Sequence, residues 1–130
     1  MTLLLDSSIL IALEKEDAKL VGKLEQLSRE HNSPLHISFM SLVEFLVGYE
    51  GLSMEKKVKS KEFIWKFPVL HTTNATALLL SKLKYDYAKK GRPKSMTDLF
   101  IASQALEHDM TLVTRDNDFS DMTEIKKVMI

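Results

Sequence analysis

The sequence predicts an α/β fold in which a mostly parallel central sheet is covered by helices on both faces. Short apolar runs typical of buried strands alternate with longer segments whose apolar residues recur at helical spacing. Several of these runs end in a polar turn that leads directly into the next helix, as in the βαβ units of parallel sheets. With 130 residues, 45% of them hydrophobic and 28% charged, the chain is expected to form a single domain over residues 1–130.

The N-terminal half is predicted to begin with a strand at residues 2–5. The apolar run there stops at Asp6, which two serines follow, and these are favoured helix-capping residues. The other elements expected in this half are a helix after that turn, an amphipathic helix over 17–31 that Asn32 and Ser33 end, a strand over 35–39, a helix from Ser41 to Gly48 or Gly51, a helix over 53–66 and a short strand over 69–70.

The C-terminal half is predicted to hold two further helices and two strands. They are a helix that Asn74 caps and that runs to Lys90, a helix that Thr97 or Asp98 caps after a break at 91–94, a strand over 111–114 and a fifth strand over 127–130. Ligands of parallel α/β sheets bind beyond the carboxyl ends of the strands. The acidic turns that follow the strands are therefore expected to cluster there.

Composition excludes several kinds of site. The chain has no cysteine, so a metal must be held by oxygen or imidazole ligands. Its 18 basic residues balance 18 acidic ones, so bulk charge makes no case for a nucleic-acid partner. No apolar run approaches the roughly 20 residues that cross a membrane, and the N-terminus lacks the features of a signal peptide. We therefore expect a cytoplasmic protein.

Four carboxylates differ from the acidic residues on polar helix faces. Asp6 and Asp116 directly follow strands, Glu44 lies between apolar neighbours, and Asp98 begins an apolar helix. Taken singly, Asp6 and Asp98 could be helix caps, Glu44 a boundary residue, and Asp116 or the nearby Asp118 part of a polar turn. Together they suit a hard divalent ion such as Mg²⁺ or Mn²⁺, which assists phosphodiester cleavage. The sequence contains no serine-hydrolase elbow, P-loop or dinucleotide-binding motif.

The segments that carry these carboxylates resemble the motifs of PIN domains, particularly those of the VapC toxins. They occur in the order and at the spacing of that family and span nearly the whole chain. The four segments are LLDSSILI at 4–11, SLVEFLVG at 41–48, TDLFIASQAL at 97–106 and LVTRDNDF at 112–119.

The resemblance implies a three-layer α/β/α PIN-like fold and a Mg²⁺- or Mn²⁺-dependent endoribonuclease. The acidic quartet that it implies is Asp6, Glu44, Asp98 and Asp116. Asp118 is an alternative metal ligand, and Asp116 is favoured because it follows the strand directly. Hydroxyls that could orient a carboxylate or a water are those of Ser8 and Thr114. The implied reaction is direct attack by metal-activated water on an RNA phosphodiester, with one carboxylate accepting the proton.

For a VapC-type toxin, family likeness also implies a homodimer and a small VapB-like antitoxin that blocks the active site. A housekeeping RNA-processing nuclease is the chief alternative, and a non-catalytic PIN-like binding module is another. A haloacid-dehalogenase-like phosphatase ranks lower, because that family needs Asp-x-Asp and Ser8 occupies the second position here.

A basic loop precedes the Asp98 helix. Its residues Lys90, Arg92 and Lys94 could steer RNA toward an anionic site, or they could simply be solvated. The four histidines have no metal-ligand spacing and are assigned no role.

Overall fold

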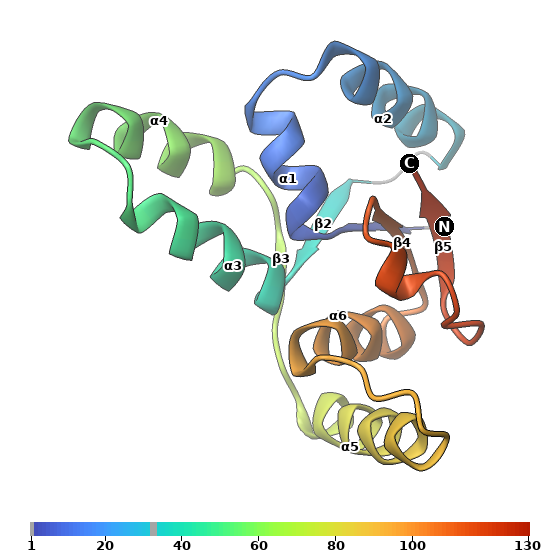
Figure 1. The fold of residues 1–130 in the computed structure, drawn as a ribbon. Coiled ribbons are helices and arrows are strands. Elements are labelled where there is room, and N and C mark those ends of the chain that lie inside the picture. The colour runs from blue at the N-terminus through green and yellow to red at the C-terminus, as the bar shows by residue number, and fades with distance from the viewer. Residues whose placement is uncertain (1, 32–33) are drawn as a thin grey trace.

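A computed structural model describes residues 2–31 and 34–130 and has a five-stranded sheet at its centre (Figure 1). The strands lie in the order β3-β2-β1-β4-β5, and all of their pairings are parallel. The helix break predicted at Asn32 and Ser33 lies outside the described residues. The elements are β1 (Thr2–Leu5), α1 (Ser7–Glu14), α2 (Ala18–His31), β2 (Leu35–Ser38), α3 (Phe39–Glu50), α4 (Met54–Ile64), β3 (Val69–Leu70), α5 (Asn74–Lys89), α6 (Met96–Glu107), β4 (Met110–Thr114), the 3₁₀ turn η1 (Asn117–Phe119) and β5 (Lys126–Met129).

Helices cover both faces of the sheet, which confirms the three-layer α/β/α prediction (Figure 1). Successive side chains of a strand point to opposite faces. Leu3 and Leu5 of β1 accordingly pack with residues of α1 to α4, whereas Leu4 packs with α5, α6 and the C-terminal segment. All three leucines are fully buried, so β1 is the centre of the core. Within the described residues, no helix has the length and apolar character needed to span a membrane.

Strand register brings the polar turns to one edge of the sheet. Leu5 pairs with Ile37 of β2 on one side and with Val113 of β4 on the other. The residues that follow these positions, Asp6 and Thr114, therefore lie side by side where the strands end. The predicted clustering at the carboxyl ends of the strands rests on this register.

The start of α6 differs from the prediction, which gave Thr97 or Asp98 as its cap. Ser95 is the cap, because its hydroxyl oxygen accepts a hydrogen bond from the backbone N–H of Asp98 at 3.1 Å. Asp98 thus lies in the first turn of the helix, and its carboxylate is not used as the cap. Thr73 caps α5 in the same way, one residue before Asn74, which was the predicted cap. Ser38 caps α3, so that helix begins earlier than its predicted start at Ser41.

Candidate metal centre

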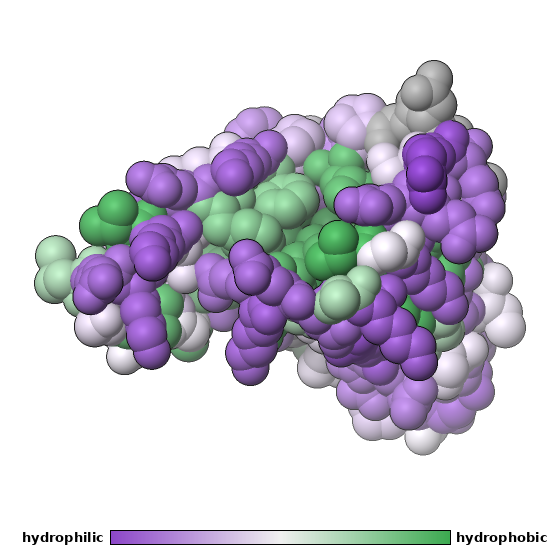
Figure 2. Space-filling view, turned by 90° about the horizontal axis from the view of Figure 1, so that it is seen from above, coloured by the Kyte–Doolittle hydropathy of each residue, from purple (hydrophilic) through white to green (hydrophobic). Residues whose placement is uncertain are grey.

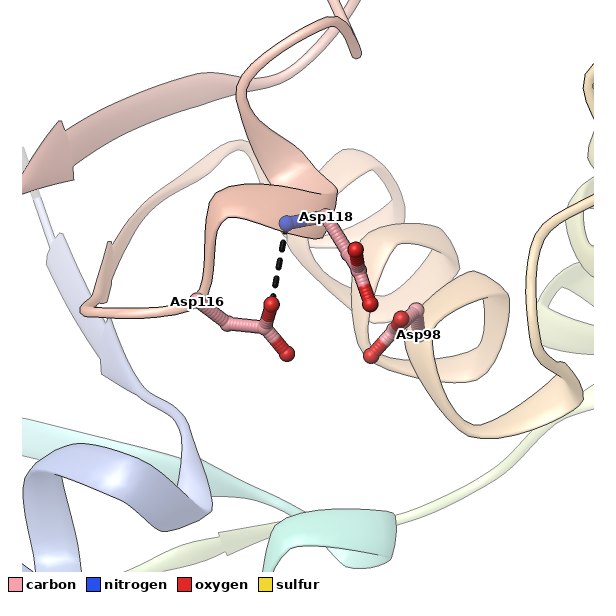
Figure 3. A group of neighbouring side chains, drawn as sticks. All are labelled: Asp98, Asp116 and Asp118. Atoms are coloured by element: carbon pink, nitrogen blue, oxygen red, sulfur yellow. Dashed lines mark hydrogen bonds between the residues drawn. The ribbon is translucent and has the colours of Figure 1, made fainter.

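Three aspartates converge beyond the carboxyl end of β4 (Figure 3). Asp98 projects from the first turn of α6, and Asp116 and Asp118 come from the turn that contains η1. One carboxylate oxygen of each lies within 4.8 Å of the others. Asp98 is buried, Asp116 is half-buried and Asp118 is exposed. The group therefore opens to solvent on one side, as a site that receives a substrate must.

Hydrogen bonds within the turn determine where Asp116 and Asp118 lie. The backbone N–H of Asp116 donates to Thr114 Oγ1 at 2.9 Å. The N–H of Asp118 donates to Asp116 Oδ1, also at 2.9 Å (Figure 3). Asp116 thereby caps η1, and the turn directs both carboxylates toward Asp98. The structure brings both candidates for the last acidic position into one group, whereas the sequence pattern favours Asp116 alone.

Asp6 borders this group from the end of β1 and is only 3% exposed. Its Oδ1 accepts hydrogen bonds from Ser8 Oγ at 2.5 Å and from the backbone N–H of Ile9 at 3.3 Å, and its Oδ2 accepts one from Thr114 Oγ1. Asp6 is therefore also the N-cap of α1. Burial raises the pKa of Asp6 despite these hydrogen bonds, and the negative charge of Asp116 adds to the rise.

Glu44 lies at the rim of the group on α3. Its side chain is exposed, and its Oε1 accepts a hydrogen bond from Ser7 Oγ at 2.9 Å. The exposure of Glu44 agrees with the alternative given above, in which it is a boundary residue whose charge reaches solvent. Its charge nevertheless acts on Asp98, as the charge of Asp116 acts on Asp6, so the acidic residues selected from the sequence lie in one neighbourhood.

The electrostatics of the group suit a cation. Burial is the main cause that raises the pKa of Asp98, and the hydrogen bond with Ser95 lowers it by less. The nearby negative charges raise the pKa further; they belong to Asp116, Asp118 and Glu44. A divalent ion would offset this repulsion, and several carboxylate oxygens are the ligands that Mg²⁺ and Mn²⁺ prefer. The residues present therefore fit such an ion.

Gln104 is a buried polar residue that the sequence pattern does not mark as functional. Its Oε1 accepts hydrogen bonds from Ser38 Oγ at 2.6 Å and from the backbone N–H of Phe39 at 3.0 Å. Its Nε2 donates to the backbone oxygen of Leu70 at 3.1 Å. The side chain thus ties α6 to the ends of β2 and β3. The sequence does offer one signal for it: Gln104 is the single amide side chain in a helix segment, residues 99–106, whose other side chains are small or apolar.

The three basic residues of the loop before α6 differ in their exposure and in their contacts with the rest of the protein. Lys90 and Arg92 are exposed, although both lie near the ring of Tyr87. Arg92 Nη1 lies 3.4 Å from Asp121 Oδ2. Lys94 is largely buried by its contacts with the turn after β4. The three predicted RNA-contact residues are therefore not equivalent.

Comparisons with known proteins agree with this architecture. The PIN domain family matches residues 3–125. A protein of Haemophilus influenzae strain R2866 called Ribonuclease VapC1 is 28% identical over 130 residues, covering 97% of this chain and 96% of the relative. The structure of VapBC-1 from nontypeable Haemophilus influenzae contains a similar chain, with 26% identity, a TM-score of 0.83 and coverage of 99% and 98%. The structure of VapBC2 from Rickettsia felis bound to a promoter DNA fragment contains another, with 19% identity, a TM-score of 0.85 and coverage of 100% and 99%. By its fold and its sequence, this chain belongs to the PIN-domain family.

Proposed function

We propose that this chain is a Mg²⁺- or Mn²⁺-dependent endoribonuclease that hydrolyses RNA phosphodiester bonds and acts as the toxin of a VapBC-type pair. The observation that carries the proposal is the convergence of Asp98, Asp116 and Asp118 beside the buried Asp6 on a PIN fold. The nearly full-length match to a relative called a ribonuclease supports it. The absence of cysteine and an RNA substrate are both consistent with a cytoplasmic location.

The acidic residues of the site divide the tasks of this reaction. Asp98, Asp116 and Asp118 would hold the cation, with Glu44 and Asp6 completing the anionic surroundings. When bound, the cation supplies positive charge that activates water and offsets the charge that develops on the phosphate. Asp6 orients the site through Thr114, whose hydroxyl group donates to Asp6 and accepts from the backbone of Asp116.

The rim of the site supplies the remaining groups. Glu44, which is exposed on α3, would accept a proton from the attacking water at a carboxylate oxygen. Lys90 and Arg92 would attract the RNA backbone toward the anionic centre. Affinity for RNA from this source is expected to fall as the salt concentration rises.

An apolar groove supports the antitoxin partner. Figure 2 shows hydrophobic surface over α1, between α4 on one side and α2 on the other. Leu13 lies in the middle of this groove. Its other apolar walls are formed by Val21, Leu24 and Leu35 on the α2 side and by Leu52 and Phe63 on the α4 side. An exposed apolar groove of this kind suits the apolar face of a partner segment, and the structures named above are of VapBC complexes.

An exposed apolar stripe on α3 supports a homodimer. Phe39, Val43 and Val47 recur at four-residue spacing on α3, so they lie on one face of that helix. All three are exposed, by 43%, 36% and 69%. Burying such a stripe against a second copy would remove apolar surface from water. The molar mass in solution, measured by light scattering, tests this part of the proposal.

The activity is tested by incubating purified protein with a mixed pool of structured RNAs in Mg²⁺, in Mn²⁺ and in EDTA. Asp98→Asn and Asp116→Asn are the test variants. Asp86→Asn is the control, because Asp86 lies on α5 and pairs with Lys82. We expect metal-dependent cleavage that both test variants lose and the control keeps. If the wild type does not cleave under any metal and no inhibitor copurifies, the non-catalytic binding module becomes the better hypothesis.

Expression in cells separates a toxin from a housekeeping nuclease. A toxin should arrest growth when it is expressed alone, and the small gene encoded beside it should restore growth when the two are coexpressed. A housekeeping nuclease should produce neither effect. Asp98→Asn in the same vector controls for the burden of expression.

A further inference from the structure

Lys94 is held by the turn that carries two of the aspartates. Its Nζ donates to the backbone oxygen of Asp118 at 2.8 Å and to Asp121 Oδ1 at 2.5 Å. Only 13% of its side chain is exposed. Lysines commonly keep the ammonium group in water, so an ammonium committed to two acceptors of one turn indicates a structural task.

The surroundings of Lys94 restrain the ammonium group further. Asp121, its carboxylate partner, also lies 3.4 Å from Arg92 Nη1. The ring of Tyr87 lies 5.9 Å from Lys94 Nζ, and its hydroxyl group donates to Glu124 at 2.7 Å. Tyr87 is almost completely buried, so it offers a fixed surface beside the lysine. The ammonium group is thus held by charge, by a backbone oxygen and by an aromatic face.

Lys94 connects the two segments whose carboxylates meet. It directly precedes Ser95, the cap of α6, and Asp98 lies in the first turn of that helix. Its acceptor, the backbone oxygen of Asp118, belongs to the turn after β4. A change at this contact would alter the separation between the start of α6 and η1, which is where the carboxylates of Asp98 and Asp118 approach one another.

We propose that Lys94 is a positioning residue that sets the spacing of Asp98 and Asp118, and with it the affinity of the centre for a divalent cation. This differs from the RNA contact expected from the sequence. The inference rests on the proposed function, because it needs a cation at the aspartates. Lys90 and Arg92, which are exposed, keep the task of contacting RNA.

The test is calorimetric titration of the full chain with Mn²⁺, which measures binding without activity. Lys94→Met removes the donors at similar length, and Lys94→Arg keeps the charge. Lys89→Met is the matched control, an exposed lysine of α5 near the same loop. We expect Lys94→Met to weaken Mn²⁺ binding about tenfold, as loss of a group that orients metal ligands does. Lys94→Arg should keep most of the affinity, and Lys89→Met should keep all of it.

Circular dichroism and thermal unfolding check that each variant is folded during the titration, so that a loss of affinity is not a loss of folded protein. If Lys94→Met does not fold, Asp121→Asn replaces it, because that variant keeps the lysine and removes its carboxylate partner. A folded Asp121→Asn should also bind Mn²⁺ more weakly than the wild type. Unchanged Mn²⁺ affinity in the folded variant tested would overturn the inference.

RNA kinetics separate positioning from RNA contact. A positioning residue should change the Mn²⁺ concentration needed for half-maximal cleavage and lower kcat. An RNA contact should raise KM for RNA and leave Mn²⁺ binding unchanged, and that result would also overturn the inference. If the wild type binds Mn²⁺ no better than Asp98→Asn does, the proposed function fails and this inference fails with it. If the wild type binds and Lys94→Met binds equally well, the inference alone fails.

Discussion

Asp98 in the first turn of α6 and Asp116 in the turn after β4 approach each other, with one carboxylate oxygen of each within 4.8 Å of the other. Asp98 is 9% exposed, so its charge is poorly hydrated as well as close to another negative charge. Such a pair opposes folding when no cation is bound. Residues kept for function in this way commonly lower the stability of the protein that carries them.

Asp98→Asn should therefore stabilise the protein in EDTA. Asparagine has nearly the same shape but no charge to desolvate or repel. We expect Tm to rise by roughly 3 °C or more, which corresponds to about 1 kcal/mol for a domain of this size. Asp86→Asn should give no such rise, since it removes a surface pair with Lys82. A lower Tm for Asp98→Asn in EDTA would contradict the repulsion argument.

The gain from Asp98→Asn should depend on pH. Because the pKa of Asp98 is raised in the folded protein, its contribution to stability is fully present below the pKa of the unfolded chain and is lost as the pH rises through the folded-state pKa. The difference in Tm between wild type and Asp98→Asn should thus be clear at about pH 7 and shrink toward about pH 3, where Asp98 is protonated in both states. Thermal unfolding across this pH range measures the difference in Tm. A difference that grows as the pH falls would contradict the expected direction.

Metal should reverse the order of stability. A cation that binds the folded protein alone stabilises it by about 2.7 kcal/mol at a hundredfold excess over its dissociation constant. Mn²⁺ should therefore raise the Tm of the wild type, and the rise should disappear on adding EDTA. Asp98→Asn, which lacks one carboxylate of the group, should respond much less. Equal shifts in both proteins would place the cation elsewhere.

Thr114→Val should damage both stability and the proposed activity. The hydroxyl group of Thr114 is fully buried, donates to Asp6 and accepts from the backbone N–H of Asp116. Its loss leaves those groups without this partner, which costs about 1–3 kcal/mol, and should lower cleavage about 10- to 100-fold.

Thr111→Val is the matched control on the same strand. Its hydroxyl group is also buried, but among the described residues it has no hydrogen-bond partner. This substitution should leave Tm unchanged or raise it, and should leave cleavage unchanged. Similar losses in both variants would mean that replacing a buried hydroxyl group with a methyl group is itself the cause, and that the hydroxyl bridge to Asp6 and Asp116 is not.

Gln104→Leu should destabilise the fold. The substitution removes one acceptor and one donor that serve Ser38, Phe39 and Leu70. Buried partners left without hydrogen bonds cost about 1–3 kcal/mol each, so a loss of about 3 kcal/mol or more in the free energy of unfolding is expected from urea denaturation. Gln26→Leu, on the exposed face of α2, should change it by less than about 0.5 kcal/mol.

Local sequence determined the elements and much of the candidate site. The apolar run at Leu3 to Leu5 reads as a buried strand, and the observed β1 ends where Asp6 begins the turn. Asp6, Glu44, Asp98 and Asp116 stand out because each interrupts or follows an apolar segment. These are properties of near neighbours along the chain, which is why hydrophobic periodicity and capping preferences can reveal them.

The tertiary structure decided which of these groups meet. Asp118 joins Asp98 and Asp116 because η1 turns its side chain toward α6, and Lys94 turns away from solvent because Asp121 and the backbone of Asp118 lie across from it. The burial of Gln104 likewise depends on strands that are distant in sequence. Such relationships come from the order and register of the parallel strands, since these set the distance between side chains that no local pattern connects.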